Sequence, residues 1–67
     1  MEALYAAAIM TGNIAHRDGK SATPCLDKNC LELIGANDGQ ALLILKGWAQ
    51  GWHSANAAEL VAGPVAL

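Results

Sequence analysis

The feature that most constrains this sequence is the stretch KGWAQGW, Lys46 to Trp52, in which two Gly-Trp pairs stand four residues apart. Four residues are about one helical turn, so Trp48 and Trp52 share one face of a helix. Glycine inside a helix costs about 1 kcal/mol relative to alanine. We therefore expect close packing at Gly47 and Gly51, with the two tryptophans as core residues.

A complementary surface is expected near the start of the chain. Residues 2–17 carry apolar side chains at helical spacings without proline, which predicts a first helix that stops near Asp18-Gly19. Small residues share one face of this helix, and they are Ala8, Gly12, Ala15 and Gly19. We expect the tryptophan rings to lie over this groove, since small side chains let two helices approach closely.

The second long helix is predicted from a cap at Asn37 to about Ala62, and Gly63-Pro64 ends it. Between the two helices, Pro24 indicates a loop. The segment 26–38 has room for a short helix, with alternative caps at Asp27 or Asn29 and an end at Gly35. The expected fold is all-α, with two main antiparallel helices in a helical hairpin. A long linker with room for that short helix joins them, and the whole chain, 1–67, is a single small helical domain.

The short length limits the core that this chain can bury. A core in a chain of fewer than roughly 70 to 80 residues rarely provides more than about 3 to 5 kcal/mol without a staple or a partner. Exposed apolar residues near the C-terminus favour a homodimer, and they are Leu60, Val61, Val65 and Leu67. Glu2 stands where a secretory signal would carry Lys or Arg, so we expect a cytoplasmic protein. We expect no membrane partner, because no apolar run approaches the length of a spanning helix.

The charges are few and mainly acidic. Four Lys and Arg against six Asp and Glu give a net charge of −2, the wrong sign for a protein that binds chiefly by neutralising phosphates. Arg17 and Lys20 bracket the end of the first helix, where they complement the helix dipole or contact phosphate. Lys46 is expected to be a solvated helix residue, and the tryptophan pair is a conceivable stacking platform for bases. The candidate binding residues are therefore Arg17, Lys20, Lys46, Trp48 and Trp52.

We expect no metal, no cofactor and no enzymatic activity. The residues that could form a Cys2His2 zinc site are Cys25, Cys30, His16 and His53, but their order and spacing fit no closed zinc site. A disulfide between the cysteines would suit a loop but not a continuous helix, and small buried thiols are the default. The sequence contains no phosphate-cradling glycine loop and no nucleophile with an evident base and orienting partner.

Two sequence blocks resemble the ribosome modulation factor family and its plasmid- and phage-encoded small relatives. The first block is Gly12-x-x-Ala15-x-x-x-Gly19-Lys20 followed by Cys25, and the second is Trp48-x-x-Gly51-Trp52-x-x-Ala55. The blocks cover about half the chain. The resemblance implies a small protein with two main helices and a linker. It also implies a non-enzymatic modulator that binds the small ribosomal subunit and promotes inactive ribosome dimers, with translation regulation and the stress response as its setting.

The chain also departs from the family pattern. Asn13 replaces an aromatic residue, Pro24-Cys25-Leu26 replaces Cys-Pro-Tyr, the linker before Trp48 is about a dozen residues longer, and the charge is acidic where the family's ribosome binder is basic. An alternative function is therefore an acidic protein-binding inhibitor or adaptor of phage or mobile-element origin on the same helical scaffold, with a protein target. The ribosome hypothesis predicts that Lys and Arg are grouped on one surface, whereas the alternative predicts an apolar or acidic patch there.

Overall fold

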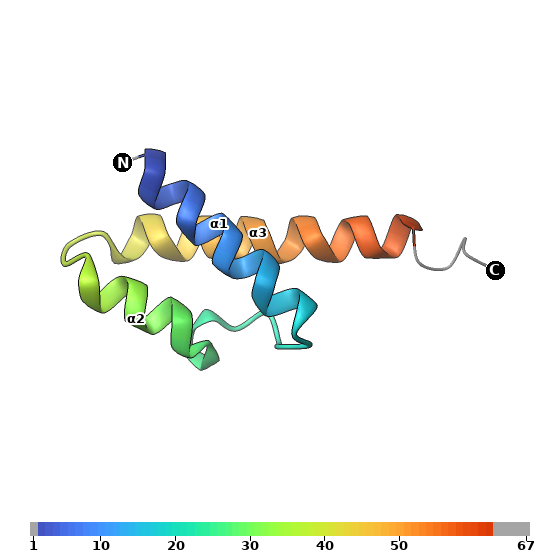
Figure 1. Cartoon of the computed structure of the whole chain (residues 1–67), viewed down its shortest axis with the longest axis horizontal. Coiled ribbons are helices and arrows are strands. Elements are labelled where there is room, and N and C mark those ends of the chain that lie inside the picture. The colour runs from blue at the N-terminus through green and yellow to red at the C-terminus, as the bar shows by residue number, and fades with distance from the viewer. Residues whose placement is uncertain (1, 63–67) are drawn as a thin grey trace.

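The computed structural model describes residues 2–62, which form three α-helices and a short 3-10 turn (Figure 1). Helix α1 spans Glu2–Arg17, the turn η1 spans Pro24–Leu26, α2 spans Lys28–Ala36 and α3 spans Ala41–Ala62. Because these residues contain no strand, the all-α prediction is confirmed for the described chain. The predicted extent of the first helix is also confirmed, and α3 is helical as far as Ala62, the last residue that the structure describes. Gly63-Pro64, the predicted stop signal, lies outside the described residues.

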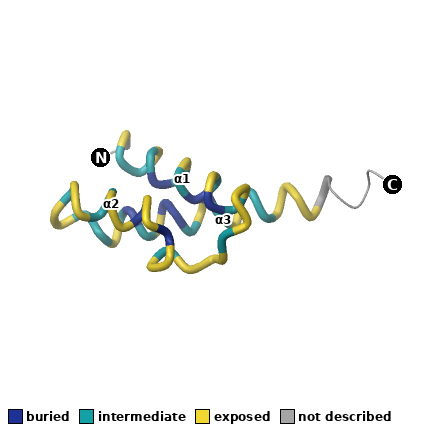
Figure 2. The backbone as a smooth tube through the Cα atoms, turned by 60° about the horizontal axis from the view of Figure 1, so that its bottom comes forward, coloured by how far each residue is buried: buried dark blue, intermediate teal, exposed yellow. Residues whose placement is uncertain are grey.

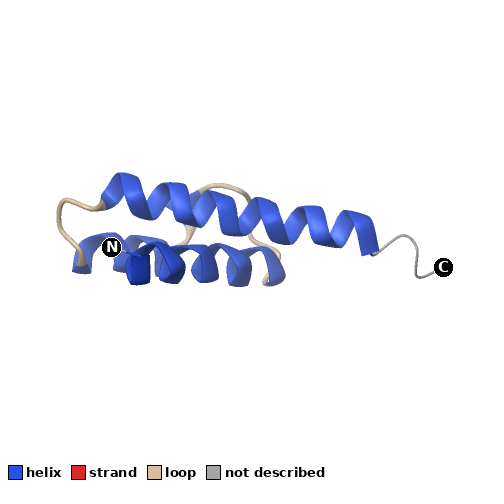
Figure 3. Cartoon of the chain, turned by 90° about the horizontal axis from the view of Figure 1, so that it is seen from above, coloured by secondary structure: helices blue, strands red, loops and turns tan. Residues whose placement is uncertain are grey.

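Helices α1 and α3 run in the same direction, so the predicted antiparallel hairpin is wrong. Tyr5, near the start of α1, donates a hydrogen bond to Gln50, and His16, near its end, lies 3.1 Å from Asn56. Residue numbers thus rise together along both helices. The reason is α2, a complete helix within the linker that runs back across the molecule before α3 begins (Figure 1). Seen from above, α3 forms one layer and the other two helices form the second (Figure 3).

The contact between α1 and α3 is made largely by backbone against backbone. A Cβ atom added at Gly12 would overlap the carbonyl oxygen of Trp48, and one added at Gly51 would overlap that of Ile9. A Cβ atom at Gly47 would lie 2.7 Å from the Cβ atom of Ala8, well inside van der Waals contact. Glycine is thus required at these helical positions by the space available, which accounts for its cost to the helix.

The small-residue face of α1 is confirmed in part. Ala8, Gly12 and Ala15 are buried against the rest of the fold, as predicted. At Gly12 this face receives the backbone of α3, and Ala8 and Ala15 belong to the same core cluster as Trp48. Gly19 was predicted to belong to the groove, but it lies past the end of the helix with a φ of 78°.

A Schellman motif ends α1 and turns the chain into the linker. The Gly19 N–H donates to the His16 carbonyl and the Lys20 N–H to the Ala15 carbonyl, at 3.0 and 2.9 Å. This pair of bonds satisfies carbonyls that the helix end leaves open, and it needs a residue with positive φ at the position of Gly19. The motif therefore fixes the direction in which Lys20 and the following residues leave the helix.

The turn between α2 and α3 differs from the prediction. Asp27 caps α2, as one of the two predicted alternatives, and its side chain accepts from the Asn29 N–H. Asn37, predicted to cap the next helix, instead closes α2, where its side chain donates to the Leu33 carbonyl at 2.8 Å. Gly35, the predicted end of that helix, lies within it. The chain reverses at Gly39, whose φ is 83°, and α3 begins at Ala41.

The core lies where the three helices meet (Figure 2). Its fully buried hydrophobic residues are Ala8, Ala15, Cys30, Ile44 and Trp48. The last turns of α3 extend past the end of α1 (Figure 1), and Leu60 there is 66% exposed. The side chains of Val61, Val65 and Leu67, with which Leu60 was predicted to form a dimer surface, lie outside the described residues. The fold is thin, with Cα extents of 45 × 23 × 12 Å.

The close approach of α1 and α3 makes Gly51 a sensitive position. We expect Gly51→Ala to lower the free energy of unfolding by about 1 to 3 kcal/mol, because the new methyl group overlaps the Ile9 carbonyl. Gly35→Ala is the matched control, since nothing lies within 4 Å of a Cβ atom there. That variant should gain up to about 1 kcal/mol from helix propensity. Urea unfolding followed by circular dichroism measures both, and equal stabilities for the two variants would contradict the packing described.

Candidate functional site

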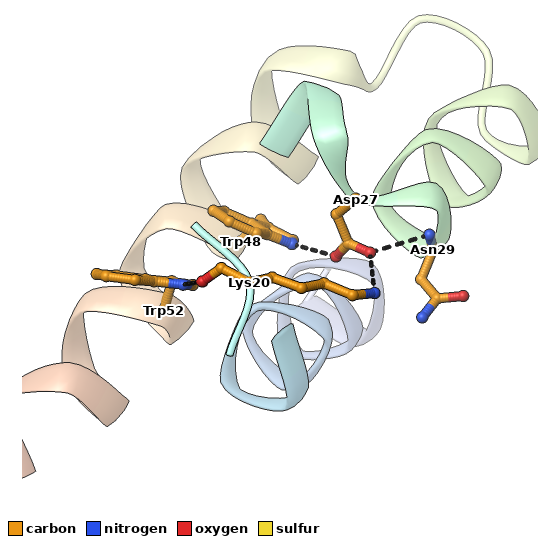
Figure 4. A network of polar contacts seen from close by, with 5 residues as sticks. All are labelled: Lys20, Asp27, Asn29, Trp48 and Trp52. Atoms are coloured by element: carbon orange, nitrogen blue, oxygen red, sulfur yellow. Dashed lines mark hydrogen bonds and ion pairs between the residues drawn. The ribbon is translucent and has the colours of Figure 1, made fainter. Parts of the chain in front are cut away.

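A buried carboxylate, Asp27, lies at the junction of the linker and α2 and is 1% exposed. One of its oxygens accepts a hydrogen bond from Trp48 Nε1 at 2.7 Å. The other accepts from the Asn29 N–H at 3.1 Å and from Lys20 Nζ at 3.2 Å. Figure 4 shows these donors converging on the carboxylate from α3, α2 and the linker. Asp27 therefore ties three segments of the chain together at one point.

The surroundings of Asp27 keep it ionised. Burial by itself raises the pKa of a carboxyl group. At Asp27 this effect is outweighed by the hydrogen bonds from Trp48, Lys20 and Asn29 and by the charge of Lys20, so the pKa lies below its ordinary value. The ammonium group of Lys20 is itself partly exposed, with 38% of its side chain accessible. Lys20 and Asp27 therefore form a hydrogen-bonded ion pair in which Asp27 is buried and Lys20 is partly exposed to solvent.

Both tryptophans donate to the linker. Trp52 Nε1 donates to the backbone carbonyl of Lys20 at 3.0 Å, and Trp48 Nε1 donates to Asp27 as described. Two indoles one turn apart on α3 thus hold two linker residues, Lys20 and Asp27 (Figure 4). We call these four residues the indole clamp. The spacing of the tryptophans, which the sequence explained only as a core feature, matches the two points where the linker crosses α3.

The three basic residues predicted as binding residues do not form one surface. Arg17, the last residue of α1, is exposed. Lys20 is paired with Asp27 inside the indole clamp. Lys46 is exposed on α3 next to Gly47, which packs against Tyr5 and Ala8 near the start of α1. Because the two helices are parallel, Lys46 and Arg17 lie toward opposite ends of α1.

The tryptophans are not arranged as a platform for bases. Trp48 is 1% exposed, so neither face of its ring is open to a ligand. Trp52 is partly buried, and its ring meets His16 and His53 edge to face, with centroid distances of 4.8 and 5.2 Å. His53 is itself exposed and thus stands at the rim of the tryptophan cluster. His16 is additionally 3.7 Å from the carboxylate of Glu59.

The two cysteines have different environments. Cys30 is buried, as predicted, and its pKa is raised by burial and then by the nearby charges of Asp27 and Cys25. Cys25 is exposed on η1, so the expectation of a second buried thiol is wrong. Both are free thiols. Within residues 2–62, no group of three or more His, Cys, Asp or Glu side chains is arranged to hold a metal ion.

Asp27 is the residue whose importance the sequence did not reveal. It was interpreted as a helix cap, which it is, but its contact with Trp48 joins residues 21 positions apart. A signal for it existed, because a buried indole N–H needs an acceptor and the linker offers few carboxylates. With its oxygens accepting from three donors and shielded from solvent, this carboxylate is suited to holding the fold and not to accepting a proton from a substrate.

Comparison of the chain with protein-family models, with characterised proteins and with solved structures gave no match. Among residues 2–62, no helix has both the length and the apolar character needed to cross a bilayer.

The lowered pKa of Asp27 gives the fold a defined acid sensitivity. Below about pH 4 the unfolded chain binds a proton at this position while the folded chain does not, so stability falls as the pH drops through this range. We expect Asp27→Asn to cost about 2 to 3 kcal/mol at pH 7, because an amide NH2 group would face the donors that now point at the carboxylate. The variant should also lose part of the stability difference between pH 6 and pH 3.

Asp38→Asn is the control for this experiment, since it makes the same chemical change at an exposed turn residue. Chemical unfolding of the wild type and both variants across this pH range measures the effect. A pH profile for Asp27→Asn parallel to that of the wild type would show that the Asp27 carboxylate does not carry the acid sensitivity.

The cysteines should differ in reactivity. We expect a thiol reagent to modify Cys25 rapidly in the folded protein and Cys30 only after unfolding, because the second thiol is buried and has a raised pKa. Mass spectrometry of the labelled peptides measures this directly. Cys25→Ser should remove the rapid phase, and rapid labelling of Cys30 in the native state would refute the burial described.

Proposed function

We propose that this protein is a non-enzymatic protein-binding module that acts as an inhibitor or adaptor of a protein target. The observation that carries the proposal is the distribution of its cations. Lys20 is neutralised by Asp27, Arg17 and Lys46 lie toward opposite ends of α1, and Lys28 is exposed at the first residue of α2. Phosphate recognition requires cations that act together on one surface. Their dispersal, together with the net charge of −2, favours contact with protein over contact with nucleic acid.

The exposed apolar side chains support this proposal. Large hydrophobic residues more than 40% exposed occur on every segment of the fold, and they are Met10, Leu26, Leu31, Leu42 and Leu60. Scattered exposed apolar residues are common in monomeric proteins. Here only five hydrophobic residues are fully buried in the part of the chain whose burial is described, so exposed apolar side chains remain available to a partner.

A ribosome-associated modulator is the second candidate function, and one observation favours it. The two blocks that resemble the ribosome modulation factor family pack on each other, since Gly12 of the first contacts the backbone of Trp48 and Trp52 in the second. Lys20 of the first block also accepts the indole N–H of Trp52 through its carbonyl group. The two blocks are expected to pack together if this chain has the same helical scaffold as the family that they resemble. In this candidate function the partner is the small ribosomal subunit.

Sedimentation of tagged protein in cell lysate, with and without ribonuclease, distinguishes the two functions. A protein-binding module should stay out of the ribosomal fractions at low salt and should capture the same protein target after ribonuclease treatment. A ribosome modulator should co-sediment with ribosomes and lose that position after ribonuclease. In that case the slope of log affinity against log salt should be no steeper than about −4, since each cation contributes at most about 0.9.

Charge reversal sharpens this test. Arg17→Glu combined with Lys46→Glu removes the two exposed candidate cations while leaving the indole clamp intact. We expect binding to the protein target to be unchanged, because apolar contacts carry it, whereas ribosome binding should fall by tenfold or more, at about 1.4 kcal/mol per factor of ten. If the wild type co-sediments with ribosomes and the double variant does not, the protein-binding proposal is overturned in favour of ribosome binding.

A further inference from the structure

The outer face of α1 is an unusual surface for a helix that covers a core. Its exposed positions follow at steps of three and four residues and are Ala3, Ala6, Met10, Ile14 and, at the last residue of the helix, Arg17. The Met10 side chain is 63% exposed and that of Ile14 is 40% exposed. From Ala3 to Ala15 the helix contains no Asp, Glu, Lys or Arg. A solvent-facing helix surface normally carries charged residues, so this face lacks the usual means of discouraging association.

We propose that the outer face of α1 binds the same face of a second copy of this chain, with the two α1 helices antiparallel. The proposal does not depend on the proposed function. Its first support is the order of sizes along the face, in which the small residues Ala3 and Ala6 come first and the large residues Met10 and Ile14 follow. A two-fold axis across an antiparallel pair lays the large half of one copy over the small half of the other.

Charge supports the same occupant and the same orientation. Helix α1 begins with Glu2 and ends with Arg17, and the face between these residues is uncharged. Antiparallel pairing therefore keeps the two Arg17 side chains at opposite ends of the pair, and the two helix dipoles oppose. A parallel pair would bring the two exposed Arg17 side chains together. Although the chain has a net charge of −2, residues 3–15 of each copy bring no charged side chain to this face.

The shape of the fold indicates how strong this dimer is. From Ala3 to Ile14 the face extends for about 16 Å at 1.5 Å per residue. One helix face of this length buries less than the roughly 800 Å² per partner of a standard interface, so a weak dimer that forms as the concentration rises is expected. For a fold only 12 Å thick in Cα extent, covering Met10 and Ile14 adds apolar burial that the monomer lacks.

Sedimentation equilibrium from low micromolar to near-millimolar concentration tests the proposal. The wild type should pass from the mass of one chain to that of two. Met10→Glu should weaken this association at least tenfold, which is about 1.4 kcal/mol. The reason is that the new carboxylate would be buried near the two-fold axis of the dimer, where no cation pairs with it. Leu42→Glu is the control, since Leu42 is 69% exposed on α3 and outside the face, and it should associate like the wild type. Ile14→Glu is a second face variant, and circular dichroism verifies that each variant is folded.

A monomer at all concentrations would overturn the proposal, and so would a dimer that both face variants leave intact. The orientation has its own measurement in a Cys25→Ser background. Chains with Ala3→Cys and chains with Ile14→Cys are mixed and oxidised, and mass spectrometry should find a disulfide between positions 3 and 14 of different copies. Disulfides formed only between like positions would refute the antiparallel arrangement.

Discussion

The two indole N–H groups of α3 are the interaction on which the rest of the fold depends. Each must find an acceptor when it leaves water, and the acceptors are a backbone carbonyl at Lys20 and a buried carboxylate at Asp27. Both acceptors belong to the segment between α1 and α2, so the tryptophans fix the path of the linker. Because Asp27 also caps α2, the same bond that satisfies Trp48 sets where that helix begins. An unpaired carboxylate in this position would be costly, and Lys20 and Asn29 prevent that by completing its hydrogen bonds.

The glycines of the helices act in a different way. They contribute no side-chain contact, and because they lack a Cβ atom they let the two helix backbones approach closely. With Gly12 on one helix and Gly47 and Gly51 on the other, α1 and α3 share a seam too narrow for a Cβ atom at any of the three positions. The indole clamp then holds the linker against α3. In a chain that has few large core residues, close packing thus holds α1 against α3, and directed hydrogen bonds hold the linker.

Much of the local structure could be predicted from the sequence, because it depends on near neighbours. The span of α1, the Asp27 cap and the close packing at Gly47 and Gly51 all follow from helix periodicity, capping preference and the cost of glycine. The direction of α3 could not be predicted, since it depends on whether the linker contains a full returning helix, and that is decided by Cys30, Leu33 and Ile34 finding a place in the core. Asn37 was assigned to the wrong helix because an asparagine can close one helix as readily as it can start the next. The Asp27–Trp48 pair could not be predicted from local rules, which do not relate residues 21 positions apart, and only the general need of a buried indole N–H for an acceptor pointed to it.

The parallel arrangement of α1 and α3 has a consequence for how the chain reaches its fold. Antiparallel helices joined by a short turn can associate from the turn outward, with each new contact closing only a small loop. Here the contacts between α1 and α3 join residues 40 and 45 positions apart, and no turn lies beside them to start the process. Closing such a loop has an entropy cost that grows with its length, so the shorter connections are favoured first. Once Trp48 has bound Asp27, α2 and α3 are joined through that contact. Only the few residues between Lys20 and Asp27 then separate α1 from them. The buried aspartate thereby serves as a tether that turns a distant encounter between two helices into a local one.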